Sequence, residues 1–184
     1  MRLSTNVQNT NKDKGKRRIF LLKIGMVVMQ MDLVTERCYI RNFNIVDVDD
    51  LYEVLSDESV MMYIESPFNN EQTKEFICEA GMCEPPLVYA VVWKLTGKVI
   101  GHVIFHPYEE VAYEIGWILN KTYWGKGIAD ELTKALIDYA RYIGISSCII
   151  ECDTKQDASK SIALKNGFAY EGIIDNLERY RLTL

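Results

Sequence analysis

Apolar and polar positions along residues 31–184 follow two different periods, which predicts a domain that mixes strands and helices. Short apolar runs bounded by turn-forming residues predict strands near residues 38–41, 87–94, 99–106, 111–119, 145–152, 168–174 and 178–182. Apolar residues at helical spacing predict helices near residues 46–55, 71–80, 127–142 and 157–166, with a short helical turn at 58–63. We therefore expect one α/β domain without internal repeats.

The middle of the chain indicates how some strands pair. Thr96-Gly97 is a tight connection between segments 87–94 and 99–106, and it predicts a β-hairpin. A turn that starts at Pro107 leads into segment 111–119, which can pair antiparallel with the second strand. The longest helix signal follows and stops at Gly144.

The first 30 residues differ from the rest in charge and composition. They hold seven Lys/Arg against one Asp, whereas residues 31–184 hold 14 Lys/Arg against 25 Asp/Glu. The polar, basic start is typical of disorder, and the apolar run 19–29 is too short to span a bilayer and contains Lys23. No small-residue cleavage site follows. We expect an extension upstream of a true start at Met31, with an amphipathic membrane-surface helix as the alternative.

Composition narrows the class of protein. A length of 184 residues with 48% apolar content suits one globular domain. The five cysteines form no CxxC pair, and the two histidines, His102 and His106, share a strand face without a third ligand nearby, so neither a disulfide framework nor a metal site is expected. A reducing cytoplasm fits this pattern. The acidic balance disfavours nucleic acid as a partner and weakly favours a cationic acceptor.

The segment YWGKGIA, residues 123–129, lies directly after a predicted strand and directly before the longest predicted helix. Gly125 and Gly127 allow a tight turn and a close approach of the backbone to a ligand. The first turn of the helix leaves N–H groups unpaired and carries a partial positive charge, an arrangement that binds pyrophosphate oxygens. Lys126 adds charge if it turns toward the ligand and none if it points into solvent.

On these residues the chain resembles the GNAT superfamily of acyl-coenzyme A N-acyltransferases, whose coenzyme A loop follows the pattern Gln/Arg-x-x-Gly-x-Gly/Ala. The pattern falls on Trp124, Gly125, Lys126, Gly127, Ile128 and Ala129. A Trp stands where Gln or Arg is usual, and this WGKG variant is similar to the branch of the Rim-type ribosomal-protein N-terminal acetyltransferases. Further matches are TERCYIRNF from Thr35, YEIGWIL from Tyr113 and SIALKNGFAYEG from Ser161, so the resemblance spans residues 31–184.

The resemblance implies a mixed, mostly antiparallel central sheet flanked by helices, with a V-shaped opening between the two central strands, 111–119 and 145–152. It further implies that the pantetheine arm of acetyl-CoA enters this opening and bonds to the backbone of Trp117, Ile118 and Leu119. Candidate contacts on the other side of the cofactor are Gln156, where relatives often have Asn, and Ser159.

Glu114 is the candidate general base that the resemblance implies. Alternation along its strand puts Ala112, Glu114 and Gly116 on one face, so the carboxylate has small neighbours. A carboxylate takes the proton of an ammonium acceptor before nitrogen attacks the thioester, and no covalent enzyme intermediate is needed. The expected activity is transfer of an acetyl group to a primary amine of a small molecule or a protein N-terminus. An exposed cross-strand residue without a catalytic role is the alternative for Glu114.

Two other classes of function stay open on the residues alone. A coenzyme A-binding sensor would bind the cofactor without turnover. A dinucleotide-binding enzyme is suggested by Gly125-x-Gly127 at a helix start and by Glu151 at the end of the next strand, although Asp130 occupies the third glycine position and only 32 residues follow Cys152. The acceptor and the choice between monomer and homodimer are open.

Overall fold

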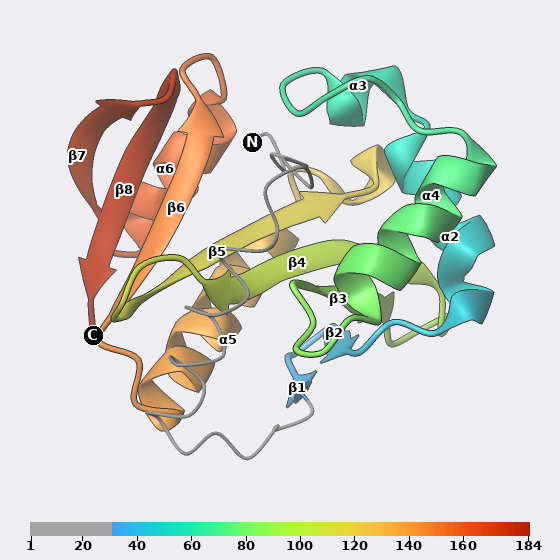
Figure 1. The fold of residues 1–184 in the computed structure, drawn as a ribbon, viewed down its shortest axis with the longest axis horizontal. Helices are drawn as coiled ribbons and strands as arrows, with labels where there is room; N and C mark the ends of the chain where they lie inside the picture. The colour runs from blue at the N-terminus through green and yellow to red at the C-terminus, as the bar shows by residue number, and fades with distance from the viewer. Residues whose placement is uncertain (1–30) are drawn as a thin grey trace, which may run out of the picture.

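The apolar segments of residues 31–184 come together as an eight-stranded sheet in a computed structural model of the chain (Figure 1). The expected extension, residues 1–30, lies outside the described residues. Across the sheet the strand order is β1-β2-β3-β4-β5-β6-β8-β7, and every neighbouring pair is antiparallel except β5 and β6. The strands are β1 (Asp32–Val34), β2 (Cys38–Arg41), β3 (Val88–Trp93), β4 (Val99–Pro107), β5 (Ala112–Leu119), β6 (Ser147–Asp153), β7 (Ala169–Ile174) and β8 (Leu177–Thr183).

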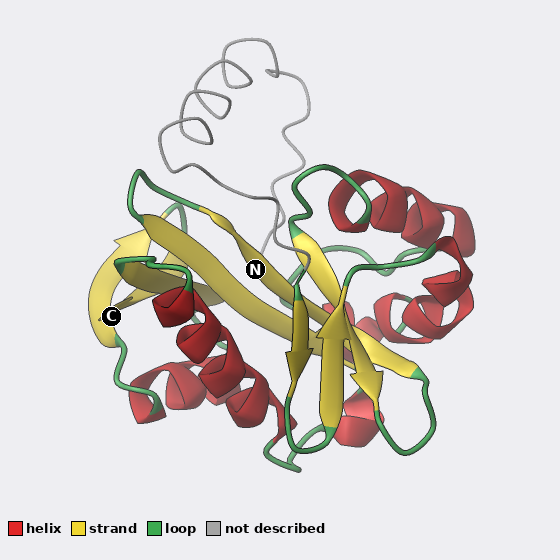
Figure 2. Cartoon of the chain, turned by 90° about the horizontal axis from the view of Figure 1, so that it is seen from below, coloured by secondary structure: helices red, strands yellow, loops and turns green. Residues whose placement is uncertain are grey.

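Helices cover both faces of the sheet and divide the core into two parts (Figure 2). On one face α5 packs its Leu132 into the same core as Ile115 of β5, and on the other α2 packs its Leu51 into the same core as Ile104 of β4. The α-helices are α2 (Val48–Leu55), α3 (Glu58–Met61), α4 (Asn70–Phe76), α5 (Ile128–Tyr142) and α6 (Asp157–Lys165). A side chain of a central strand therefore packs in one of these two parts of the core, depending on the face of the sheet on which it lies.

β5 and β6 start side by side and then part, as Figure 1 shows. Their parallel pairing has three residue pairs and ends at Glu114 and Ile149. Beyond this point β5 stays paired with β4 as far as Leu119, and β6 stays paired with β8 as far as Asp153. The expected V-shaped opening is confirmed, and its vertex is at Glu114.

The observed elements agree with the sequence pattern, with three local differences. β1 was not expected, because three residues are too few to show a period. The helix expected at 46–55 begins as a 3₁₀ turn, η2 (Ile45–Asp47), which Asn44 caps. The helix expected at 71–80 ends its α-helical part at Phe76 and continues as a π-helical turn, η3 (Ile77–Gly81).

The topology also decides between two of the functional alternatives. The strands that precede the glycine loop, β3, β4 and β5, are antiparallel neighbours. A dinucleotide-binding fold needs a doubly wound parallel sheet at this place. That alternative is therefore wrong. Within residues 31–184, no helix has the length and apolar content needed to cross a membrane, and no group of three His, Cys, Asp or Glu side chains is arranged to hold a metal ion.

Candidate active site

The chain after β5 turns sharply at two glycines before α5 begins. A single 3₁₀ turn, η4 (Lys121–Tyr123), starts this connection and is capped by Asn120. Gly125 and Gly127 then adopt φ values of +69° and +75°, a region that residues with side chains rarely occupy. Among residues 31–184, and apart from the two residues next to Gly125 in the chain, no atom lies within 4 Å of the position that a Cβ on Gly125 would take, so this side of the loop is open. The tight turn expected from the glycine spacing is present.

Two side chains fix the loop to neighbouring elements. Trp124 donates from its indole Nε1 to the carbonyl oxygen of Leu119 at 2.8 Å. Arg37, in the turn between β1 and β2, donates from Nη1 to the carbonyl oxygen of Lys126 at 2.7 Å. Its Nε and its backbone N–H also donate to the two carboxylate oxygens of Glu131, at 2.7 and 2.8 Å. Sequence reasoning missed Arg37, because periodicity says nothing about a contact 94 residues away.

The other loop side chains differ in exposure. The Lys126 ammonium lies 5.4 Å from the ring centroid of Tyr123, where a cation–π contact holds it near the loop. Ile128, the first residue of α5, is buried in the core, and Ala129 beside it is half-buried. The apolar residues therefore anchor the helix start, while the backbone between the glycines is left at the surface.

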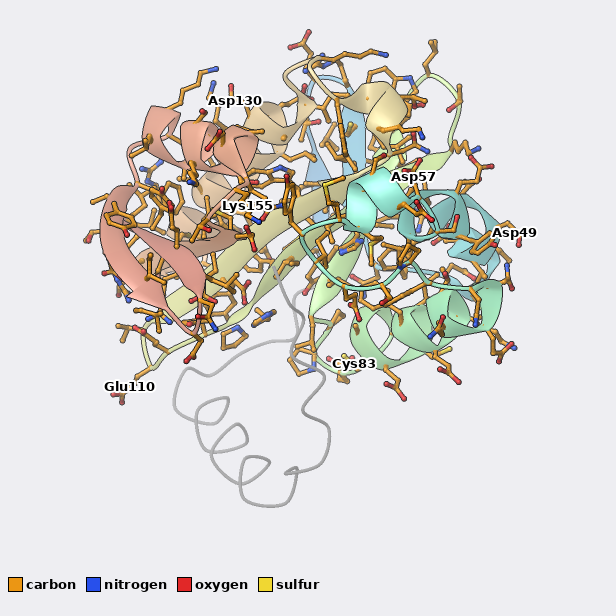
Figure 3. All side chains as sticks on the ribbon, turned by 90° about the horizontal axis from the view of Figure 1, so that it is seen from above. Asp49, Asp57, Cys83, Glu110, Asp130 and Lys155 are labelled. Atoms are coloured by element: carbon orange, nitrogen blue, oxygen red, sulfur yellow. The ribbon has the colours of Figure 1, made fainter. Side chains whose placement is uncertain are left out.

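Asp130, labelled in Figure 3, links the start of α5 to the end of α6. Its carboxylate accepts from Lys134 at 3.0 Å, Lys165 at 2.9 Å and the Asn166 side-chain amide at 2.8 Å. Burial opposes ionisation, but these hydrogen bonds outweigh it and lower the pKa of Asp130 to about 2. The carboxylate is therefore ionised and balanced by two ammonium groups.

The edge of β5 presents backbone groups to the V-shaped opening. Asn120 N–H donates to a β4 carbonyl at 2.8 Å, and successive residues of a strand direct their backbone groups to opposite sides. Trp117 and Leu119 therefore direct their backbone groups toward the opening, whereas Ile118 directs its groups toward β4. The Leu119 carbonyl already accepts from Trp124. Of the three residues expected to contact a pantetheine arm through their backbone, Trp117 and Leu119 direct backbone groups into the opening and Ile118 does not.

The β6 side of the opening ends in the turn before α6, which Lys155 marks in Figure 3. The Gln156 side-chain oxygen accepts from the Asp153 N–H at 2.9 Å and so closes this turn. Ser159 lies half-buried in the first turn of α6. Because β5 and β6 are parallel, the glycine loop and this turn follow their carboxyl ends at the same edge of the sheet, which is where α/β proteins bind ligands.

Glu114 lies at the vertex of the opening, directly opposite His106 of β4. Its Oε2 is 3.3 Å from His106 Nε2, and the side chains of the glutamate and histidine are 14% and 18% exposed. The other ring nitrogen, Nδ1, is 3.0 Å from the carbonyl oxygen of Pro107. The sequence placed His106 on a strand face but not opposite Glu114. The length of the turn after Pro107 could have shown that the two residues are opposite each other, because the length of a hairpin connection sets the register of the two strands that it joins.

A second polar cluster joins the turn after β4 to β6 and β8. Tyr108 donates its hydroxyl to Glu151 of β6 at 2.7 Å, and Arg179 of β8 donates from Nε to the same oxygen at 2.8 Å. Arg179 also donates to the Tyr108 hydroxyl. Burial raises the pKa of Tyr108, with smaller contributions from the charges of Glu151 and Glu114. The hydroxyl is therefore neutral and lies within electrostatic range of Glu114.

His102 shares its strand face with His106 but lies in the core. It is fully buried, with its ring centroid 5.2 Å from that of Phe76. Neither ring nitrogen has a hydrogen-bond partner within the described residues. Burial lowers the pKa of His102 to about 3, so the imidazole is neutral at neutral pH.

Comparison with known proteins gives the family. A family model described as an acetyltransferase (GNAT) domain matches residues 37–169. The chain belongs to the GNAT acetyltransferase family. It is 32% identical over 145 residues to an uncharacterized N-acetyltransferase, YnaD, of Bacillus subtilis (strain 168), covering 77% of this chain and 85% of that protein. This GNAT chain is accordingly an acetyltransferase.

Solved structures of similar fold include an acetyltransferase of the GNAT family from Bacillus anthracis. It is 28% identical to this GNAT chain, with a TM-score of 0.76, and the match covers 83% of this chain and 98% of that one. The same fold occurs in RimL, a ribosomal L7/L12 alpha-N-protein acetyltransferase, in complex with coenzyme A. There the identity is 20% and the TM-score 0.72, over 83% of this chain and 97% of the other.

A groove of about 750 Å³ lies on the other side of the glycine loop of this GNAT chain. It runs between β1 and α5 and touches the loop at Gly127. Its lining residues come from β1, the following turn and α5, so it is separate from the opening between β5 and β6. Glu114 does not line this groove and lies only at the vertex of the opening.

Proposed function

We propose that this chain transfers the acetyl group of acetyl-CoA to a primary amine by direct attack, with Glu114 as general base. The position of Glu114 carries the proposal, because it is the last residue of β5 that pairs with β6. The glycine loop lies at the open end of the same V. A cofactor bound by its pyrophosphate at the loop and by its arm along β5 therefore brings its thioester toward Glu114.

Binding of acetyl-CoA rests on backbone groups in this proposal. The N–H groups between Gly125 and Ala129 take the pyrophosphate oxygens at the start of α5. Trp117 and Leu119 offer backbone groups to the pantetheine arm. From the other arm of the V, Gln156 in the turn before α6 and Ser159 in its first turn contact the same cofactor.

The reaction removes two protons from the acceptor nitrogen. The bound ammonium first gives one proton to Glu114 and becomes a nucleophile. Nitrogen then bonds to the thioester carbonyl carbon, and backbone N–H groups stabilise the negative oxygen. When the C–S bond breaks, the second nitrogen proton balances the charge of the departing thiolate. The acceptor amine belongs to a small molecule or a protein N-terminus, the latter class being the one named for the structural neighbour RimL.

The test is release of coenzyme A thiol from acetyl-CoA with a panel of amines and N-terminal peptides. Glu114→Gln keeps the size of the side chain but accepts no proton, so turnover should fall by about 10² or more while acetyl-CoA affinity stays nearly constant. Glu110→Gln, an exposed position in the nearby turn, is the matched control. Acetyl-CoA binding without thiol release on any amine would instead support a coenzyme A-binding sensor.

A further inference from the structure

We infer that His106 and Glu114 hold one proton between them and act together as the proton acceptor of the site. His106 is then a positioning residue that works through Glu114 rather than by touching the substrate. The inference rests on the proposed role of Glu114 as base. It adds that the carboxylate does not act alone.

The hydrogen-bond geometry of the imidazole carries the inference. His106 Nδ1 lies 3.0 Å from the Pro107 carbonyl oxygen, which only accepts, so this nitrogen carries a proton. A neutral imidazole has one N–H, which leaves a lone pair on Nε2. That lone pair faces the Glu114 carboxylate at 3.3 Å, where two acceptors would repel each other. A single proton between the two atoms converts this repulsion into a charge-assisted hydrogen bond.

The fold keeps the two side chains in this position. Residues 106 and 114 are direct partners in the antiparallel ladder of β4 and β5. Both side chains are more than four-fifths buried, so water screens their interaction weakly. On the β6 side Glu114 is opposite Ile149, which offers no polar group. The contact therefore follows from the register and not from an exposed side-chain rotamer.

Within residues 31–184, the charged groups near the pair for which contacts are seen are themselves paired. The Arg179 guanidinium forms ion pairs with Glu151 at 2.8 Å and with Glu109 at 3.5 Å. These carboxylates balance its positive charge, so its effect on Glu114 is weak. Tyr108 is neutral because its pKa is raised. His102, on the same face of β4, is neutral because burial lowers its pKa to about 3. The imidazole of His106 is thus the neighbour placed to share a proton with Glu114.

The proton balance of the reaction follows. In the unprotonated pair the carboxylate takes one proton from the ammonium, and Nε2 stabilises that proton by accepting a hydrogen bond from it. The amine bonds to the carbonyl carbon, the C–S bond breaks, and the second nitrogen proton ends on the thiolate sulfur. The pair then releases its proton to solvent. The sum is ammonium plus thioester giving amide, thiol and one free proton.

The variant His106→Asn tests whether the base is the pair or the carboxylate of Glu114 alone. A pair that shares its proton gives it up at a higher pH than the carboxylate alone, so the acidic limb of the kcat profile should move at least one pH unit lower in the variant. The lone carboxylate is a weaker base, and kcat at neutral pH should fall about tenfold with KM for acetyl-CoA unchanged. His106→Gln should behave alike, because an amide donates but does not take up the proton.

Two comparisons make the outcome decisive. The double variant His106→Asn, Glu114→Gln should be no slower than Glu114→Gln, since two residues that act as one unit are not additive. If Glu114→Gln is slow but both His106 variants keep the wild-type acidic limb and kcat, the pair is overturned and Glu114 stands. If Glu114→Gln keeps wild-type turnover, the proposed base is itself wrong. Acetyl-CoA affinity checks the fold, and His106→Gln carries the test if His106→Asn does not fold.

Discussion

His102 gives the fold a steep dependence of stability on pH. The imidazole is fully buried against Phe76, and within residues 31–184 neither ring nitrogen has a hydrogen-bond partner. Burial lowers its pKa to about 3, from an ordinary value of 6.5. The unfolded chain therefore binds a proton at His102 as the pH falls through 6.5, whereas the folded chain stays neutral there until about pH 3.

The magnitude follows from the width of this window. Above pH 6.5 the protonation of His102 takes nothing from the stability of the fold. Between pH 6.5 and about pH 3, each pH unit removes about 1.4 kcal/mol from the free energy of unfolding. A change from pH 7.5 to pH 5 therefore removes about 2 kcal/mol through His102 alone. His102→Met binds no proton and keeps an apolar contact with Phe76, so it abolishes this term. Because the nitrogens it removes are unpaired, the substitution should be nearly neutral at pH 7.5.

Urea unfolding of wild type and His102→Met at the two pH values measures the effect. The difference in free energy of unfolding should shift by about 2 kcal/mol in favour of the variant on going to pH 5. His106→Asn replaces the chain's other histidine, which contacts a carboxylate, and should show no such gain. Parallel losses in wild type and His102→Met would refute the reasoning and would show that the buried imidazole is protonated or hydrated in the folded state.

Three further predictions concern the cofactor loop and the start of the chain. Gly127→Val forces a β-branched residue to φ +75° and should weaken acetyl-CoA binding at least tenfold, about 1.4 kcal/mol. Calorimetry measures this affinity, and an unchanged value in a folded variant would show that the loop does not bind the cofactor. Arg37→Gln loses the contacts to Lys126 and Glu131 and should weaken acetyl-CoA binding severalfold at nearly constant kcat, while Lys74→Gln, an exposed lysine on α4, serves as control. Deletion of residues 1–30 should leave turnover intact; loss of folding in a chain that starts at Met31 would contradict this.

The sequence pattern predicted most elements because each carried its own signal. β3, β4 and β5 are bounded by turn residues, and α5 has apolar residues on one face and Gly144 at its end. The glycine loop was predictable for the same reason, since two glycines before a helix require an unusual backbone. Local signals of this kind need no knowledge of the rest of the fold.

The contacts that organise the site were not predictable in the same way. Periodicity assigns a side chain to a face of its own strand but does not give the opposite residue on the next strand, so the His106 and Glu114 pair stayed hidden. The sequence shows that Trp124 stands where relatives have Gln or Arg, but its hydrogen bond to Leu119 depends on how the loop folds back on β5. Arg37 is remote in sequence from the loop that it holds.

The start of α5, where we propose that the pyrophosphate binds, carries two carboxylates that other side chains neutralise. Asp130 and Glu131 lie in its first turn, where carboxylates stabilise a helix but repel a phosphate group. Asp130 is balanced by two lysines, and the guanidinium of Arg37 binds Glu131. Because both carboxylates are neutralised by cations, they do not cancel the partial positive charge of the N–H groups at Gly127. Arg37 both holds the loop and removes this repulsion, so its loss should affect acetyl-CoA binding more than the loss of Lys165, which leaves Lys134 on Asp130.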